Sequence, residues 1–372
     1  MFDLRWLQAT DEQVRAAVPP GSPVAKAKPL RGTAITGAVA LVVAVAGTTA
    51  LASAGVSNGF LGFLLTAAFI VAACCGIALL IRRGSRNTGV TDQRLDWVAA
   101  ANGFFHNPSG LPAVDTMLLH AGHDVDGKHF FWNAAGDEFG SISYTTGSGK
   151  SQSAHHWHYV AARLPAPLPR MVLDATSNNF LGTDLPQGFA RDQHVELEGD
   201  FDKHFTLYAP LEYQQDALYV FTPDVMASFI DNASRWNVEI IDDTVIFLAQ
   251  PGADYRRPEP WFEAEQLFAT AIAELKQRAS RYLDDRVAGQ PVRAIDQAAA
   301  YAAAVAAAAP ASPGEKPGVL PDAPAAASFM RPTIAPQGRR LKTRGVWGIG
   351  AVIFLGWIAI SIVNQVITHL LR

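Results

Sequence analysis

The sequence predicts an α+β domain with an antiparallel sheet, accompanied by three transmembrane α-helices. Residues 32–81 contain no Asp, Glu, Lys, Arg or His, which is unusual for a soluble domain. A second charge-free apolar stretch covers residues 345–368. Between the two stretches, residues 90–290 alternate polar and apolar side chains in short runs separated by turn residues, and then change to a helical period. Hairpin strands followed by a helix are typical of an α+β domain.

The apolar stretch at residues 32–82 is long enough for two membrane crossings, because one crossing needs about 20 apolar residues. Turn-forming residues at 55–59 divide it into helices expected at 33–54 and 60–81. Residues 345–368 are expected to form the third transmembrane helix. A secretory signal peptide fits poorly, because about 30 residues precede the apolar run and the run does not stop at a cleavage site.

Lysine and arginine residues lie beside each predicted span, on what would be the same side of the membrane. The clusters are Lys26, Lys28 and Arg31; Arg82, Arg83 and Arg86; and Arg339, Arg340, Lys342 and Arg344. Because positive residues are retained in the cytoplasm, the sequence predicts a multi-pass protein of the cell inner membrane or plasma membrane. The N-terminus and the main domain are expected to be cytoplasmic and the C-terminus outside.

Two segments are expected to lie outside the folded domain. Residues 1–31 form a cytoplasmic N-terminal segment, in which the amphipathic pattern of residues 2–18 suits either the membrane surface or a solvated tail. Residues 291–344 are predicted to be an Ala- and Pro-rich linker, helical by propensity at 292–309 and flexible at 310–337. Its basic end, residues 339–344, is expected at the anionic inner leaflet, where each charge adds roughly 1 kcal/mol.

Short sequence patterns predict the elements of the domain at residues 90–290. The expected strands are 128–133, 141–146, 156–164, 204–208, 217–221, 237–241 and 244–249, and the expected helices are 222–230 and 259–287. Residues 147–150 predict a hairpin turn, and Asp242 and Asp243 predict a second one. Thr222 and Pro223 are typical of a helix start.

The helix expected at 259–287 carries an apolar stripe that includes Trp261, Ile272 and Leu275. Such a stripe needs a sheet to cover. One arrangement that fits is a pleckstrin-like roll closed by this long C-terminal helix. Asp284 and Arg286 fall at the helix end and are expected to be solvated.

Two histidines are the candidate metal ligands. His156 and His158 would point to the same side of a strand, which is a plausible ligand spacing. His120 and His123, with the neighbouring Asp124, could complete a zinc site if the fold brought them together. The alternative is a polar sheet face that carries imidazoles beside aromatic partners. No catalytic residue and no cofactor are predicted.

Several function classes are disfavoured. The net charge is -4 and the pI about 6.2, so there is no basic field for nucleic acid. The turn Gly147-Ser148-Gly149-Lys150 lacks the first glycine of a phosphate loop and is followed by a strand. The predicted spans contain no charged residue, which disfavours an ion path. Cys74 and Cys75 are the only cysteines, so the domain has no disulfide and no thiolate site.

Several short motifs resemble a family of bacterial integral membrane proteins that carry a domain of unknown function. The motifs lie at 144–150, 163–165, 168–169, 198–205 and 221–226. The resemblance covers roughly residues 110–250 and implies a bacterial membrane location and a single domain. It supplies no catalytic residue.

The sequence therefore predicts a membrane-anchored, non-enzymatic binding or scaffolding module on the cytoplasmic face. Its partner would be an unknown protein or a lipid head group, in addition to the lipid bilayer itself. One alternative is a metal-dependent membrane enzyme that uses His156 and His158. A second alternative is an accessory subunit of a transport or envelope complex. The sequence leaves open whether the chain acts alone or as an oligomer.

Overall fold

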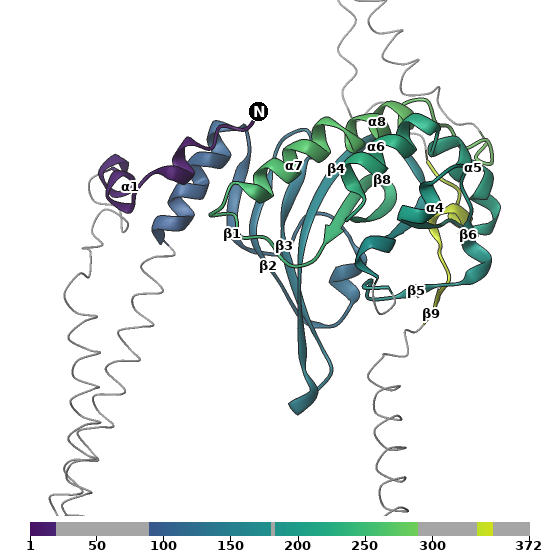
Figure 1. Cartoon of the computed structure of the whole chain (residues 1–372), viewed down its shortest axis with the longest axis horizontal. Helices are drawn as coiled ribbons and strands as arrows, with labels where there is room; N and C mark the ends of the chain where they lie inside the picture. The colour runs from purple at the N-terminus through teal and green to yellow at the C-terminus, as the bar shows by residue number, and fades with distance from the viewer. Residues whose placement is uncertain (20–88, 180–182, 289–332, 345–372) are drawn as a thin grey trace, which may run out of the picture. The chain divides into compact units, whose positions relative to one another are not determined.

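The computed structural model describes residues 1–19, 89–179, 183–288 and 333–344 (Figure 1). The predicted membrane spans, within 32–82 and 345–368, lie outside the described residues. Within the described ranges, no helix is long and apolar enough to cross a membrane. The chain forms two compact units. The first comprises Met1–His106 and Tyr255–Pro258, and the second comprises Asn107–Asp254 and Glu259–Arg372.

The N-terminal residues of the first unit form two short helices. The 3-10 helix η1 covers Arg5–Gln8 and helix α1 covers Asp11–Ala17. Helix α1 begins with a capping box, in which the side chains of Thr10 and Gln13 each accept a hydrogen bond from the other residue's backbone N–H. A further helix covers residues 89–101.

The N-terminal segment is held against the helix at 89–101. The Asp3 N–H donates to Asn102 Oδ1 at 2.6 Å, and Asn102 Nδ2 donates back to the Asp3 carbonyl at 3.0 Å. The rings of Trp6 and Trp97 lie 4.5 Å apart between centroids. These contacts correct the expectation for residues 2–18, which are neither a solvated tail nor one continuous amphipathic helix.

A seven-stranded sheet forms the centre of the second unit. Its strand order is β1-β2-β3-β4-β7-β6, and β8 also pairs with β4. The strands are β1 (Phe105–Gly110), β2 (His123–Trp132), β3 (Glu138–Thr146), β4 (Ser153–Ala175), β6 (His194–Val195), β7 (Phe205–Tyr208) and β8 (Asn237–Ala249). The pairs β2–β3, β3–β4, β4–β7, β4–β8 and β6–β7 are antiparallel. The predicted α+β class with an antiparallel sheet is confirmed.

Strand β8 runs without reversal through the residues that were expected to form a hairpin turn. Both halves of β8 pair with β4, with Ile240 opposite Met171 and Val245 opposite Ala162. Between them the register shifts, and Asp242 has a φ of 50°. The hairpin prediction was wrong because Asp tolerates this left-handed conformation within a bulge as well as within a turn.

Helices cover one face of the sheet (Figure 1). They are α4 (Phe201–His204), α5 (Gln214–Val220), α6 (Pro223–Ala233), α7 (Glu259–Ala269) and α8 (Ala271–Ala279). The predicted strand at 217–221 was wrong, because most of it lies in α5. The helix predicted at 259–287 breaks at Thr270, whose hydroxyl donates to the Gln266 carbonyl at 2.7 Å. The described residues therefore lack the one long helix expected to close a pleckstrin-like roll.

Despite the break at Thr270, the predicted apolar stripe faces the sheet from both α7 and α8. Trp261 on α7 and Ile272 and Leu275 on α8 are fully buried. The Trp261 ring lies 4.5 Å from the ring of Phe131 on β2 and 5.3 Å from that of Phe139 on β3, between centroids. Burial of these side chains holds the helices on the sheet.

The opposite face of the sheet is covered by short elements. They include the 3-10 helix η2 (Met117–His120) and a two-stranded sheet of β5 (Gly188–Phe189) and β9 (Thr343–Arg344). The 3-10 helix η7 (Pro336–Arg339) precedes β9 in the chain. Side chains from this sheet face and its cover form one apolar cluster, including Trp157, Tyr159 and Phe189, and Leu341 packs against it. Both faces of the sheet are therefore buried, and the second depends partly on residues near the C-terminus.

Candidate functional site

The two predicted metal ligands lie on the same side of β4, as expected, but in different surroundings. His156 is exposed. His158 is 2% exposed, with Nδ1 3.5 Å from Glu263 Oε2 and its ring edge-on to Trp236. Burial lowers the pKa of His158, and the hydrogen bond to Glu263 opposes this effect. His158 is therefore a buried core residue that lies beside the carboxylate of Glu263.

The other histidines considered for a metal site have partners of their own. His120 Nε2 lies 3.1 Å from Asp115 Oδ1. His123 lies 3.0 Å from Asp124 Oδ2 through one ring nitrogen and 2.9 Å from the Gly147 carbonyl through the other. In the part of the chain that the structure describes, no group of three or more His, Cys, Asp or Glu could hold a metal ion.

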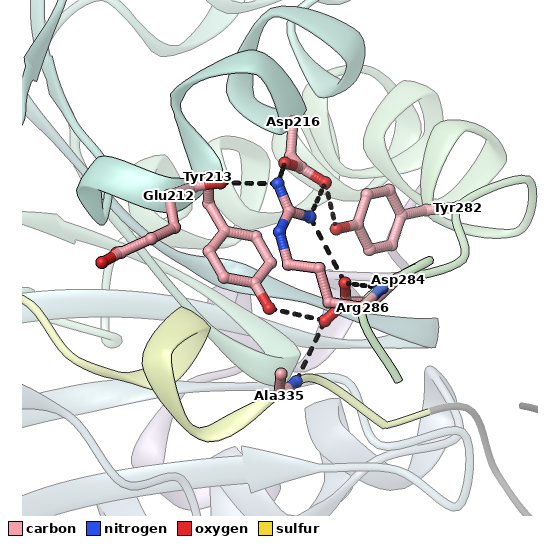
Figure 2. A network of polar contacts seen from close by, with 7 residues as sticks. All are labelled: Glu212, Tyr213, Asp216, Tyr282, Asp284, Arg286 and Ala335. Carbon is pink, nitrogen blue, oxygen red and sulfur yellow. Dashed lines mark hydrogen bonds and ion pairs between the residues drawn. The ribbon is translucent and has the colours of Figure 1, made fainter. Parts of the chain in front are cut away.

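A polar network joins residues near 284 to the C-terminal segment 333–344 (Figure 2). Asp284 is 1% exposed. Its Oδ2 accepts a hydrogen bond from the Tyr213 hydroxyl at 2.6 Å and another from the Ala335 N–H at 3.0 Å. The expectation that Asp284 is solvated was wrong, because the docked segment covers it.

Arg286 completes this network from the other side. Its guanidinium lies over the Tyr213 ring, with Cζ 4.1 Å from the ring centroid. Its two terminal nitrogens donate to both carboxylate oxygens of Asp216, at 3.1 and 2.8 Å, and Asp216 also accepts from the Tyr282 hydroxyl at 2.7 Å. A bidentate pair of this kind fixes orientation as well as charge. Arg286 is exposed, as expected, and its guanidinium is nevertheless held by these contacts.

The protonation states of the network follow from these contacts. Burial raises the pKa of Asp284, but the hydrogen bonds from Ala335, Tyr213 and Arg286 outweigh it and leave the pKa below its usual value. Burial and the hydrogen bond to Asp284 raise the pKa of Tyr213. Asp284 is therefore an ionised acceptor and Tyr213 a neutral donor near neutral pH, which makes the contact to Ala335 charge-assisted.

A second set of contacts fixes the other end of the segment. Gln193, which is 2% exposed, accepts a hydrogen bond from the Lys342 N–H at 2.8 Å and donates to the Lys342 carbonyl at 3.0 Å. Strand β9 then pairs with β5, with Phe189 opposite Thr343. The predicted linker at 291–344 is corrected in its last residues, because 333–344 is an integral part of the second unit.

Gly338 marks the closest approach of the docked segment to the domain. A Cβ at this position would lie 2.6 Å from Ile334 Cγ2 and 2.6 Å from a Tyr213 ring carbon. Ile334 itself is 4% exposed. Only glycine fits between these two side chains, so the segment packs as tightly as a protein core.

An open groove of about 620 Å³ adjoins the segment. It is lined by Ala135, Arg163, Leu164, Pro165, Pro167, Asp242, Asp243, Lys276 and Arg339. Each basic side chain that lines the groove has a carboxylate nearby. Arg163 lies 3.5 Å from Asp243, and Arg339 lies 2.8 Å from Asp242. Lys276 lies 2.7 Å from Asp137. The charges in the groove are therefore locally balanced, which does not favour a strongly charged ligand.

Outside this region lie, among others, the buried carboxylate of Glu239 and the half-buried carboxylate of Asp184. Glu239 is fully buried and accepts hydrogen bonds from the Thr116 hydroxyl, the Met117 N–H and Arg170 Nη2 at 3.0, 2.9 and 2.8 Å. Asp184 accepts from Asn237 Nδ2 at 2.7 Å. Burial raises the pKa of Asp184 to about 6, with a contribution from the charge of Asp174.

Local sequence patterns contained little indication of the docked segment. Its two large apolar residues, Ile334 and Leu341, were the available signal, since such side chains are seldom left in water. Asp284 could not be identified, because its burial depends on residues some 50 positions away.

Comparison of the chain with protein-family models, with curated proteins and with solved structures finds no match.

Proposed function

We propose that this protein is a non-enzymatic, membrane-anchored binding or scaffolding module whose main domain stands on the cytoplasmic face of a bacterial membrane. The observation that carries the proposal is the docking of residues 333–344. These residues immediately precede the predicted span at 345–368, and they are fixed to the domain at Ala335, Gly338 and Lys342. The domain is thus attached firmly to the point where the chain would enter the bilayer.

The first unit supports the same topology from the other end of the chain. Residues on either side of the predicted helical hairpin touch each other, since Asp3 bonds to Asn102 and Asp11 lies 2.7 Å from Arg94. Two segments in contact must lie on the same side of a membrane. An even number of crossings between them follows, which agrees with the two spans expected within 32–82.

The metal-dependent alternative has less support. His158 lies in the core beside Glu263 and Trp236, whereas His156 is exposed. A catalytic metal needs about three protein ligands and an open position. The arrangement of these two histidines supplies neither a third ligand nor a shared cavity.

Cysteine labelling tests the proposed topology. In a full-length Cys74→Ser, Cys75→Ser background, we expect Ala16→Cys and Ala269→Cys to resist a membrane-impermeant maleimide in intact cells and to react after permeabilisation. A cysteine replacing Arg372 should react in intact cells. Reaction of the Ala269→Cys variant before permeabilisation would contradict a cytoplasmic domain.

Limited proteolysis tests whether the domain holds residues 333–344 firmly. The Gly338→Ala variant places a methyl group against Ile334 and Tyr213, and overpacking of this kind costs about 1–3 kcal/mol. We expect trypsin to cleave the detergent-solubilised variant after Arg339 or Arg340 about tenfold faster than the wild type. The matched control is Gln337→Ala at the exposed neighbouring position. Equal rates for all three proteins would show that the segment is not held by the domain.

A further inference from the structure

Two arginines meet at the contact between α1 and the helix at 89–101. Arg94 Nη2 donates a hydrogen bond to Asp11 Oδ1 at 2.7 Å, and Arg15 Nη2 lies 3.9 Å from Asp11 Oδ2. One carboxylate therefore bridges two guanidinium groups that come from different helices. All three residues belong to the first unit.

Both guanidinium groups are largely withdrawn from water and poorly satisfied. The side chains of Arg15 and Arg94 are only 18% and 14% exposed. Within the described ranges, the Nε atoms of both are buried without a hydrogen-bond partner, and the 3.9 Å contact of Arg15 is too long for a hydrogen bond. A guanidinium has five N–H donors and keeps its charge, so burying it without acceptors costs free energy. The pair therefore has room for a further acceptor.

The carboxylates on the helix at 89–101 are directed to another partner. Asp92 and Asp96 lie two positions before and after Arg94, and helical residues so spaced do not face each other. Asp96 Oδ1 lies 2.7 Å from His106 Nδ1. Burial raises the pKa of Asp92, and the charges that act on it are those of His106 and Asp96. These two carboxylates therefore do not compensate the charge of Arg94.

The charge balance at the arginine pair is positive. Glu12, which precedes Arg15 by three positions on α1, is exposed, and the ion pair that Arg15 makes is with Asp11. Among the described residues, two positive charges thus share the one negative charge of Asp11, whose side chain is half-exposed. The site is open to solvent beside Asp11, and an added oxyanion would neutralise the remaining charge.

We propose that Arg15 and Arg94 bind a phosphate group between α1 and the helix at 89–101. Asp11 shows that one anion can reach both guanidinium groups at once. A phosphate has more acceptor oxygens than a carboxylate, and its oxygens match the paired N–H donors of arginine. A lipid head group and a soluble phosphate present the same chemistry, and the experiment separates these two sources. The inference goes beyond the anchoring proposal and does not depend on it.

Hydrogen–deuterium exchange of the full-length protein in a phosphate-free maltoside detergent tests the site. We expect about 10 mM inorganic phosphate to slow exchange of residues 11–17 about fivefold, because a ligand that joins the two helices stabilises their docked state. Chloride at the same ionic strength is the control. Phosphatidylglycerol in the same micelles is the second probe, with a phosphate-free galactosyl diacylglycerol as its control.

The two probes identify the source of the phosphate. Protection by inorganic phosphate would support a soluble ligand, and protection by phosphatidylglycerol alone would support a lipid head group. Absence of protection by both probes would overturn the inference. Arg15→Gln should abolish the protection, whereas Arg5→Gln, the same change at an exposed arginine of the N-terminal segment, should retain it.

Asp11→Asn separates phosphate binding from a purely structural ion-pair cluster. The substitution removes the negative charge that competes with phosphate, so the phosphate concentration that gives half of the protection should fall about fivefold. In a purely structural cluster, Asp11→Asn would instead speed the exchange of α1, and phosphate would not reverse the change. That result would overturn the inference and leave the anchoring proposal standing, since cysteine labelling tests the latter separately.

Discussion

At the scale of single residues, buried carboxylates are the feature that local sequence did not reveal. Glu239 is stabilised by three hydrogen bonds, one of them from Arg170, yet burial still raises its pKa. Asp284 has the opposite outcome, because its donors outweigh burial. The balance between burial and hydrogen bonding, and not burial alone, decides the direction in which each pKa moves.

The raised pKa of Asp184 predicts a stability that depends on pH. The folded-state pKa of about 6 lies above the usual value for an unfolded Asp, so folding binds the proton more tightly. The corresponding stability is fully present below about pH 4 and is lost as the pH rises through about 6, by on the order of 2 kcal/mol for this partly buried group.

Asp184→Asn mimics the protonated side chain and should remove this dependence. We expect the variant to melt at a higher temperature than the wild type at pH 8 and at a similar temperature near pH 4, measured by thermal unfolding in detergent. The control is Asp126→Asn at an exposed position. Parallel pH profiles for the Asp184→Asn variant and the wild type would show that folding leaves the pKa of Asp184 unchanged, contrary to this prediction.

At the scale of elements, short segments are ordered by their partners and not by their own propensity. Helix α1 spans only Asp11–Ala17, and helices of this length are marginal alone in water. Its position depends on contacts with the helix at 89–101, such as the ion pair of Asp11 and Arg94. Strand β9 likewise has only two residues, and it is ordered as a strand by its pairing with β5.

The Asn102 side chain should therefore control the order of the N-terminal segment. It both accepts from and donates to the backbone of Asp3, and each such hydrogen bond contributes about 1 kcal/mol. We expect Asn102→Ala to increase amide exchange of residues 3–8 roughly tenfold in hydrogen–deuterium exchange mass spectrometry. Gln8→Ala, at an exposed position in the same segment, should have little effect. Unchanged exchange in the Asn102→Ala variant would assign the docking to the Trp6 and Trp97 rings alone.

At the scale of the whole molecule, the fold closes a long stretch of chain into a loop. The Ala335 N–H bonds to Asp284, so the residues on either side of 289–332 are anchored close together. Closing a flexible loop costs conformational entropy, and each doubling of its length adds about 0.6 kcal/mol.

Shortening this loop should strengthen the docking of 333–344. Replacing residues 290–331 by about ten Gly and Ser residues halves the length roughly twice and should stabilise the docked state by about 1 kcal/mol. Trypsin cleavage after Arg339 or Arg340 should then slow about fivefold relative to the wild type. Adding Gly338→Ala to the shortened chain should restore fast cleavage. Faster cleavage in the shortened chain alone would mean that 290–331 itself contributes to docking.

The sequence alone determined the elements that local patterns encode. Alternation identified β3, with Ile142 and Tyr144 buried on one face, and the turn residues at 147–150 identified its hairpin with β4. The apolar stripe of α7 and α8 was recognised from its helical period, although the break at Thr270 was not. These features depend on neighbours within a few positions, so a single stretch of sequence contains the information.

Tertiary structure alone decided the continuity of β8, the burial of Asp284 and the docking of 333–344. Strand β8 is continuous because both of its halves pair with β4, and no local pattern distinguishes a bulge at Asp242 from a turn. Gln193 and Lys342 are 149 positions apart, and their reciprocal hydrogen bonds form only once the domain has folded. A carboxylate or a short polar segment has no periodicity of its own, so its place depends on which distant surface covers it.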